Sequence, residues 1–80
     1  MAHLRLFASA RDAAGTASER VDGSTVGEVL ENASIRFGDG FARVLATSRV
    51  WVNGESADRT TVVVDDDEVA VLPPVSGGSS

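Results

Sequence analysis

The chain has 80 residues, 42% of them hydrophobic, which allows one folded domain with a small core. It has no cysteine and a single histidine, His3, so disulfides, thiolate catalysis and cysteine-ligated metal sites are excluded, and we expect no metal site. The formal net charge of −5 opposes binding to a phosphate backbone, which argues against nucleic acid and favours a protein partner with a basic docking surface.

The N-terminal segment, residues 3–8, alternates in polarity. Leu4, Leu6 and Ala8 fall on one face and Phe7 on the other, which predicts a half-buried strand. Residues 17–22 are typical of a weaker second strand. Residues 12–16, which contain a glycine, are then predicted to form the turn of a hairpin between the two strands.

A helix is predicted to begin after Thr25, because Thr25 and Glu28 have the spacing of a capping box. Gly38 is well placed to end it. Residues 41–46 fit a second short helix, although their pattern does not decide the type. The apolar positions of the first helix recur at intervals of three and four and form one stripe: Val26, Val29, Leu30, Ala33 and Phe37.

Residues 49–53 alternate again and predict a strand. Val50 and Val52 point inward, Trp51 points to the opposite face, and Asn53 with the following glycine indicates a tight turn.

The C-terminal part of the domain is predicted to contain two more strands. Residues 61–64 form a short β-branched run, residues 65–67 a polar turn, and residues 68–72 the last strand. Pro73 and Pro74 end this strand, because proline has no amide hydrogen to donate to a sheet. One main helix on a mixed sheet of four to five strands gives an α+β, two-layer domain over residues 1–74, followed by a flexible tail.

Alternation also predicts a surface on the face of the sheet that the helix does not cover. Phe7, Trp51 and Leu72 project from this face, and such an exposed apolar group usually marks an interaction surface. Alternatively, the outer face is simply less polar than usual, or the register of one strand is wrong.

Two further chemistries are disfavoured by the sequence. The acidic run at residues 65–68 lacks the ligand spacing and central glycine of a calcium loop, so a solvated turn is the better interpretation. No Ser/His/acid arrangement or phosphate-binding glycine loop is present, so we expect no autonomous enzyme.

No apolar run has the length of a signal peptide or a membrane span, and we expect a cytoplasmic protein.

The last six residues, 75–80, carry a diglycine. Two prolines stiffen the start of this tail, and Gly77 and Gly78 have no side chains, so the chain from Val75 to Gly78 can enter a narrow channel in another protein. A diglycine alone is a weak motif, and a free end without function is the alternative.

Three segments of the chain resemble the MoaD/ThiS family of ubiquitin-like sulfur carriers, most closely the MoaD branch. They are DEVAVLPPVSGG at residues 67–78, LRLFASARDAAGT at residues 4–16 and STVGEVLE at residues 24–31. The resemblance implies a ubiquitin-like β-grasp fold. It also implies that Phe7, Arg11 and Leu72 lie where such carriers meet their partner enzymes.

The resemblance further implies chemistry at the carboxyl group of Gly78. An ATP- and Mg²⁺-using activating enzyme (MoeB- or ThiF-like) adenylates this carboxylate, and a sulfur donor converts it to a thiocarboxylate. A large synthase subunit (MoaE-like) then uses the sulfur for molybdopterin. The chain itself binds no cofactor and acts as a protein cosubstrate.

The sequence departs from the family pattern at its end, because Ser79 and Ser80 hold the carbonyl of Gly78 in a peptide bond. A peptidase could remove them, the tail could have lost its chemistry, or the terminus could be altered. Other pathways remain open for a carrier, including thiamine, cysteine and tRNA thiolation, as does a role as a protein modifier or binding module.

Overall fold

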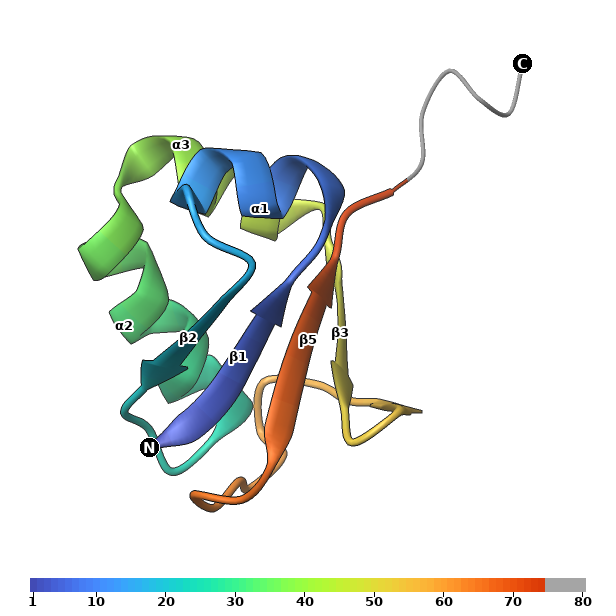
Figure 1. Cartoon of the computed structure of the whole chain (residues 1–80). Coiled ribbons are helices and arrows are strands. Elements are labelled where there is room, and N and C mark those ends of the chain that lie inside the picture. The colour runs from blue at the N-terminus through green and yellow to red at the C-terminus, as the bar shows by residue number, and fades with distance from the viewer. Residues whose placement is uncertain (75–80) are drawn as a thin grey trace.

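The computed structural model describes residues 1–74. The chain forms five strands and three helices in this part (Figure 1). In chain order they are β1 (Ala2–Leu6), α1 (Ala8–Ala14), β2 (Ser18–Val21), α2 (Val26–Phe37), α3 (Asp39–Ala46), β3 (Arg49–Val52), β4 (Glu55–Ser56) and β5 (Glu68–Leu72).

The five strands form one mixed sheet in the order β2-β1-β5-β3-β4. The central pair, β1 and β5, is parallel, whereas β2 pairs with β1, and β3 pairs with both β5 and β4, in antiparallel fashion. Because β1 and β5 run the same way, α1 follows β1 at the same end of the sheet at which the chain leaves β5 (Figure 1). The predicted α+β architecture is confirmed.

The core lies between one face of the sheet and the helices. Leu4 and Leu6 of β1 lie beside Val69 and Val71 of β5, and all four side chains are buried. The predicted apolar stripe of α2 packs on them, with its last residue, Phe37, only partly buried. Among residues 1–74, no helix lies against the opposite face of the sheet (Figure 1).

The start of α2 is capped as predicted. The Thr25 hydroxyl accepts a hydrogen bond from the amide of Glu28 at 3.2 Å. The Glu28 carboxylate in turn accepts one from the amide of Ser24 at 2.8 Å, one residue earlier than in the usual capping box. The helix ends at Gly38, as the sequence indicated.

Residues 39–46 form a helix, α3, which decides the element type that the sequence left open. Phe41 and Leu45 of α3 are buried in the core, and the ring of Phe41 meets that of Phe37 edge-on, with 5.2 Å between centroids. These contacts fix α3 beside the C-terminal end of α2.

The prediction of a hairpin turn at residues 12–16 is wrong. The two strands pair as predicted, but helix α1 connects them, and Ala8 is the exposed first residue of this helix rather than an inward residue of β1. Alanine has the highest helix propensity, yet its small side chain gives a weak apolar signal. Only Ala10 of α1 is buried, so no stripe was visible in the sequence.

The prediction of a strand at residues 61–64 is also wrong, since this segment forms only a single bridge between Thr25 and Val62. Its neighbour is the start of α2 rather than a strand. The carbonyl oxygens of Thr61 and Arg59 each accept a hydrogen bond at 2.9 Å, from the amides of Val26 and Gly27. These amides are free at any helix start, so the segment pairs with them instead of joining the sheet.

Candidate functional site

The C-terminal chain leaves the domain from the middle of the sheet. β5 lies between β1 and β3 and ends at Leu72, after which Pro73 is half-buried and Pro74 is exposed (Figure 1). β5 pairs with β1 up to Val71 and with β3 up to Leu72, so its neighbours hold the strand almost to the point where the chain leaves the sheet. Three predicted site residues, Val75, Gly77 and Gly78, lie outside the described residues.

The predicted apolar surface is present beside this exit. Phe7, Trp51 and Leu72, which we call the exit patch, have 39%, 36% and 36% of their surfaces exposed. Register explains why they share the open face of the sheet. Leu6 pairs with Val71 and Val50 pairs with Val71 on the buried face, so the neighbouring residues on these strands project from the opposite face. The structure therefore brings together three side chains from β3, β5 and the end of β1.

The fourth predicted contact residue, Arg11, lies in the last turn of α1. The amide of Arg11 donates a hydrogen bond to the carbonyl of Phe7 at 3.4 Å. Arg11 therefore lies at the same end of the domain as the exit patch. Its side chain is exposed and makes no ion pair with the described residues.

Two arginines of the exit region were missed in the sequence. The guanidinium of Arg5 lies 5.7 Å from the centroid of the Phe7 ring and donates to the Glu68 carboxylate at 3.0 Å. Arg49 pairs in register with Leu72. The alternation that placed Phe7 and Trp51 on the open face applies equally to Arg5 and Arg49, so the signal was present in the sequence.

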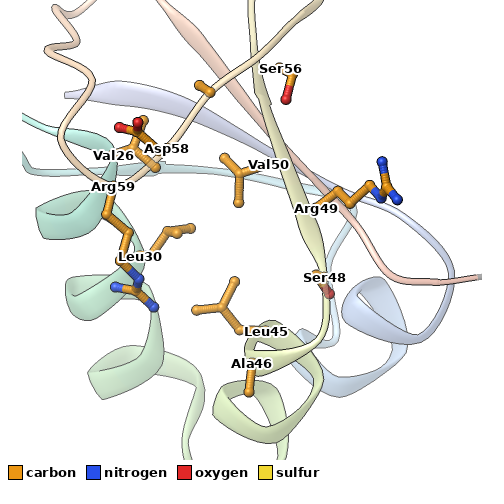
Figure 2. A pocket seen from close by; sticks show the side chains of 11 residues that line it. Val26, Leu30, Leu45, Ala46, Ser48, Arg49, Val50, Ser56, Asp58 and Arg59 are labelled. Atoms are coloured by element: carbon orange, nitrogen blue, oxygen red, sulfur yellow. The ribbon is translucent and has the colours of Figure 1, made fainter.

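A separate groove of about 360 Å³ lies on the other side of β3. Leu30, Leu45 and Val50 point into it from α2, α3 and β3 (Figure 2). Arg49 also lines the groove, although the end of its side chain is directed away from it. No buried polar side-chain atom in residues 1–74 lacks a hydrogen-bond partner, so the groove contains no unsatisfied group that would call for a ligand. None of the three residues of the exit patch lines it.

Comparison with known proteins identifies the family. The model of the ThiS family matches residues 4–78, which is nearly the whole chain. The chain belongs to the ThiS family. This match confirms the resemblance of the sequence to the ubiquitin-like sulfur carriers. Members of this family are small carrier proteins rather than catalysts.

Solved structures agree with this ThiS-family assignment and with the ubiquitin-like β-grasp fold. SAMP1 from Haloferax volcanii is 32% identical, with a TM-score of 0.83, and the match covers 95% of this chain and 97% of that one. A putative molybdopterin converting factor subunit 1 from Pyrococcus furiosus is 26% identical, with a TM-score of 0.80 and coverages of 92% and 97%. The BexX/CysO complex of Amycolatopsis orientalis contains a chain that is 24% identical, with a TM-score of 0.79 and coverages of 98% and 100%, and shows the fold alone.

In the part of this ThiS-family chain that the structure describes, no three His, Cys, Asp or Glu residues gather closely enough to hold a metal ion. The acidic run forms a turn, in which Asp67 has a structural role. Its carboxylate accepts hydrogen bonds from the Asn53 side chain and the Val64 amide, each at 2.9 Å.

Among residues 1–74, no helix has both the length and the apolar character needed to cross a membrane.

Replacing Asp67 with Ala is expected to weaken the dependence of stability on acid pH. The hydrogen bonds from Asn53 and Val64 lower the pKa of the Asp67 carboxyl, so the folded state binds its proton less readily than the unfolded state does. This contribution to stability is present above the ordinary aspartate pKa of about 4 and is lost as the pH falls through the lowered value.

Urea unfolding at several pH values measures the effect. The variant should be less stable than the unchanged chain at pH 7, and this difference should shrink below about pH 4. Asp66→Ala is the matched control, because the Asp66 carboxylate accepts no hydrogen bond from residues 1–74. Equal pH profiles for the two variants would contradict the assigned role of Asp67.

Proposed function

We propose that this chain is a cytoplasmic sulfur carrier for molybdopterin synthesis and that Gly78 is its reacting residue. Removal of Ser79 and Ser80 by a peptidase exposes the Gly78 carboxylate. The carboxylate attacks the α-phosphorus of ATP in an activating enzyme, pyrophosphate leaves, and a sulfur donor then displaces AMP to form a thiocarboxylate. ATP and Mg²⁺ act in the activating enzyme, and this chain holds no cofactor.

The observation that supports this proposal most is the extent of the family match. It includes both Gly77 and Gly78 and ends at Gly78, so Ser79 and Ser80 lie outside it. The exit of the chain from β5, a strand paired with β1 and β3, agrees with the same proposal, because a reacting chain end must reach into a partner while the domain docks outside. A carboxylate is a poor electrophile, and adenylation supplies the leaving group that sulfur transfer needs.

The pathway is the finer part of the proposal. The likeness to the putative molybdopterin converting factor subunit and the segment before the diglycine favour molybdopterin, with a MoaE-like large subunit as acceptor and a MoeB- or ThiF-like activating enzyme. Thiamine, cysteine or tRNA thiolation would use the same chemistry at Gly78.

A protein modifier is the second candidate, favoured by the 32% identity to SAMP1, a small archaeal modifier protein. In that role Gly78 would form an amide bond with a lysine of another protein, with loss of the activating group. The chain contains no lysine, so it could not build lysine-linked chains of itself.

The intact mass of the chain, isolated from its own cells, tests the proposal. A carrier has lost the mass of Ser79 and Ser80 and gained the difference between oxygen and sulfur. A modifier appears instead as a mass increment on other proteins. A chain that retains both serines throughout would contradict both roles.

Replacing Phe7 with Ser is expected to weaken binding to the activating enzyme by about tenfold or more, since aromatic anchors carry much of the energy of an interface. The melting temperature should change little, because the Phe7 side chain lies outside the buried core. Titration calorimetry and thermal unfolding measure the two quantities. Ile35→Ser is the control, since Ile35 is 77% exposed on α2. A large loss of stability in Phe7→Ser alone would assign Phe7 to the core instead.

A further inference from the structure

The segment at residues 61–64 is paired along one edge only. Its hydrogen bonds to residues 24–26 are made by the carbonyl of Thr61 and the amide of Val63, each at 2.9 Å. In this antiparallel pairing the residue between them, Val62, directs its own amide and carbonyl to the other edge. In the part of the chain that the structure describes, neither group has a hydrogen-bond partner. The segment therefore has an open backbone edge at Val62.

This open edge carries exposed apolar side chains. Val62 and Val64 have 70% and 61% of their surfaces exposed, whereas Val63 between them is buried in the core. Two grooves of about 590 and 540 Å³ border the segment, and Val62 lines both. Exposed valines beside unpaired backbone groups favour pairing with a further strand.

The charge around the open edge is negative. The residues that line the two grooves include no arginine and four carboxylates, those of Glu55, Asp65, Asp66 and Asp67. Asp65 pairs with the N-terminal ammonium, and Asp67 accepts the hydrogen bonds described above. Glu55 and Asp66 form no ion pair and accept no hydrogen bond within residues 1–74. Their charges are therefore uncompensated and are suited to lysine or arginine side chains of a partner.

The open edge lies far from the exit of the tail. The turn at residues 65–67 precedes Glu68, the first residue of β5, whereas the chain leaves the domain at the other end of this strand (Figure 1). A partner bound at Val62 would therefore leave the exit patch and the tail free.

We propose that the open edge at Val62 binds an extended, basic segment of another protein as an added strand. The backbone of Val62 pairs with the backbone of the partner, Val62 and Val64 contact a small apolar residue, and Glu55 and Asp66 pair with basic side chains. A second copy of this chain is disfavoured as the occupant, because each copy has a net charge of −5, and a phosphate backbone is disfavoured for the same reason. This binding site goes beyond the carrier chemistry, since it includes no residue of the tail.

Titration of the unchanged 80-residue chain with an eight-residue peptide that alternates lysine and valine, followed by amide NMR, tests the inference. The largest shifts should fall on Val62 and its neighbours, and exchange of the Val62 amide with water should slow by about tenfold or more at saturation. The same peptide with every amide nitrogen methylated should bind about tenfold more weakly, because it keeps its charges and loses its backbone donors.

The contribution of charge is measured with the double variant Glu55→Gln/Asp66→Asn. It should bind the peptide about fourfold more weakly, since each exposed ion pair contributes modestly. The matched control is Asp12→Asn/Glu31→Gln, which removes the same number of charges at exposed positions of α1 and α2. The control should change binding by less than about 1.5-fold.

Several outcomes would overturn the inference. The absence of a shift at Val62 at about 1 mM peptide, or largest shifts at the exit patch, would show that this edge is not the binding site. Equal binding of the methylated peptide would exclude strand addition, and equal losses in the two double variants would show that only net charge matters. Shifts at Val62 that depend on the concentration of the chain alone would assign the edge to a second copy, and shifts caused by a single-stranded oligonucleotide would assign it to nucleic acid.

Discussion

Deleting Gly78, Ser79 and Ser80 is expected to abolish adenylation and sulfur transfer while the domain stays folded. All buried hydrophobic residues among residues 1–74 lie between Ala2 and Val71, so the core is complete before the tail begins. The melting temperature should therefore stay within about 2 °C of that of the full chain. Adenylation and sulfur transfer should fall to background, because the family match ends at Gly78 and this variant has no carboxylate at that position.

The matched control removes only Ser79 and Ser80. In a purified mixture of activating enzyme, ATP and sulfur donor, without a peptidase, this shorter chain should be converted to a thiocarboxylate, whereas the full chain should not react. Mass spectrometry reads both results. Conversion of the full chain without cleavage would contradict the processing step, and unfolding of the chain that lacks Gly78 would contradict the picture of a tail independent of the core.

Replacing Gly23 with Ala is expected to lower the free energy of unfolding strongly. Gly23 has a φ of 154°, and a Cβ atom there would lie 2.6 Å from the amide nitrogen of Val29. Backbone strain and overpacking together should cost about 2 to 4 kcal/mol. A domain of this size has only about 3 to 5 kcal/mol in total, so much of the variant should be unfolded at room temperature.

Gly40→Ala provides the control. Gly40 lies in α3, and a Cβ atom there would have nothing within 4 Å. Alanine favours the helix, so this variant should be more stable by up to about 1 kcal/mol. Urea unfolding measured by circular dichroism gives both values. A Gly23→Ala variant as stable as the unchanged chain would mean that the loop before α2 is not packed as described.

Local patterns in the sequence predicted the parts of the fold in which one element forms its own signal. Thr25 and Glu28 cap α2 because both partners lie within one turn, and alternation placed Trp51 and Leu72 on the open face because side chains on a strand alternate regardless of its neighbours. Two elements were predicted wrongly, α1 and the segment at residues 61–64, and the short strand β4 was not predicted. For α1, the side chains are too small to give an apolar pattern. For residues 61–64, the partner that decides the structure is the start of α2, which is distant in the sequence.

The candidate site divides in the same way. The order of residues along the chain shows by itself that a diglycine tail follows a pair of prolines that ends the last strand. The resemblance to a carrier family followed from three segments, at residues 4–16, 24–31 and 67–78. Net charge, by contrast, does not locate the arginines and carboxylates on the surface, since a sum over the chain contains no positions. Only the pairing of β5 between β1 and β3 brings Arg5 and Arg49 together around Phe7 and Leu72 and leaves the acidic turn at the other end, because strand register is fixed by burial of the apolar face across residues far apart in the sequence.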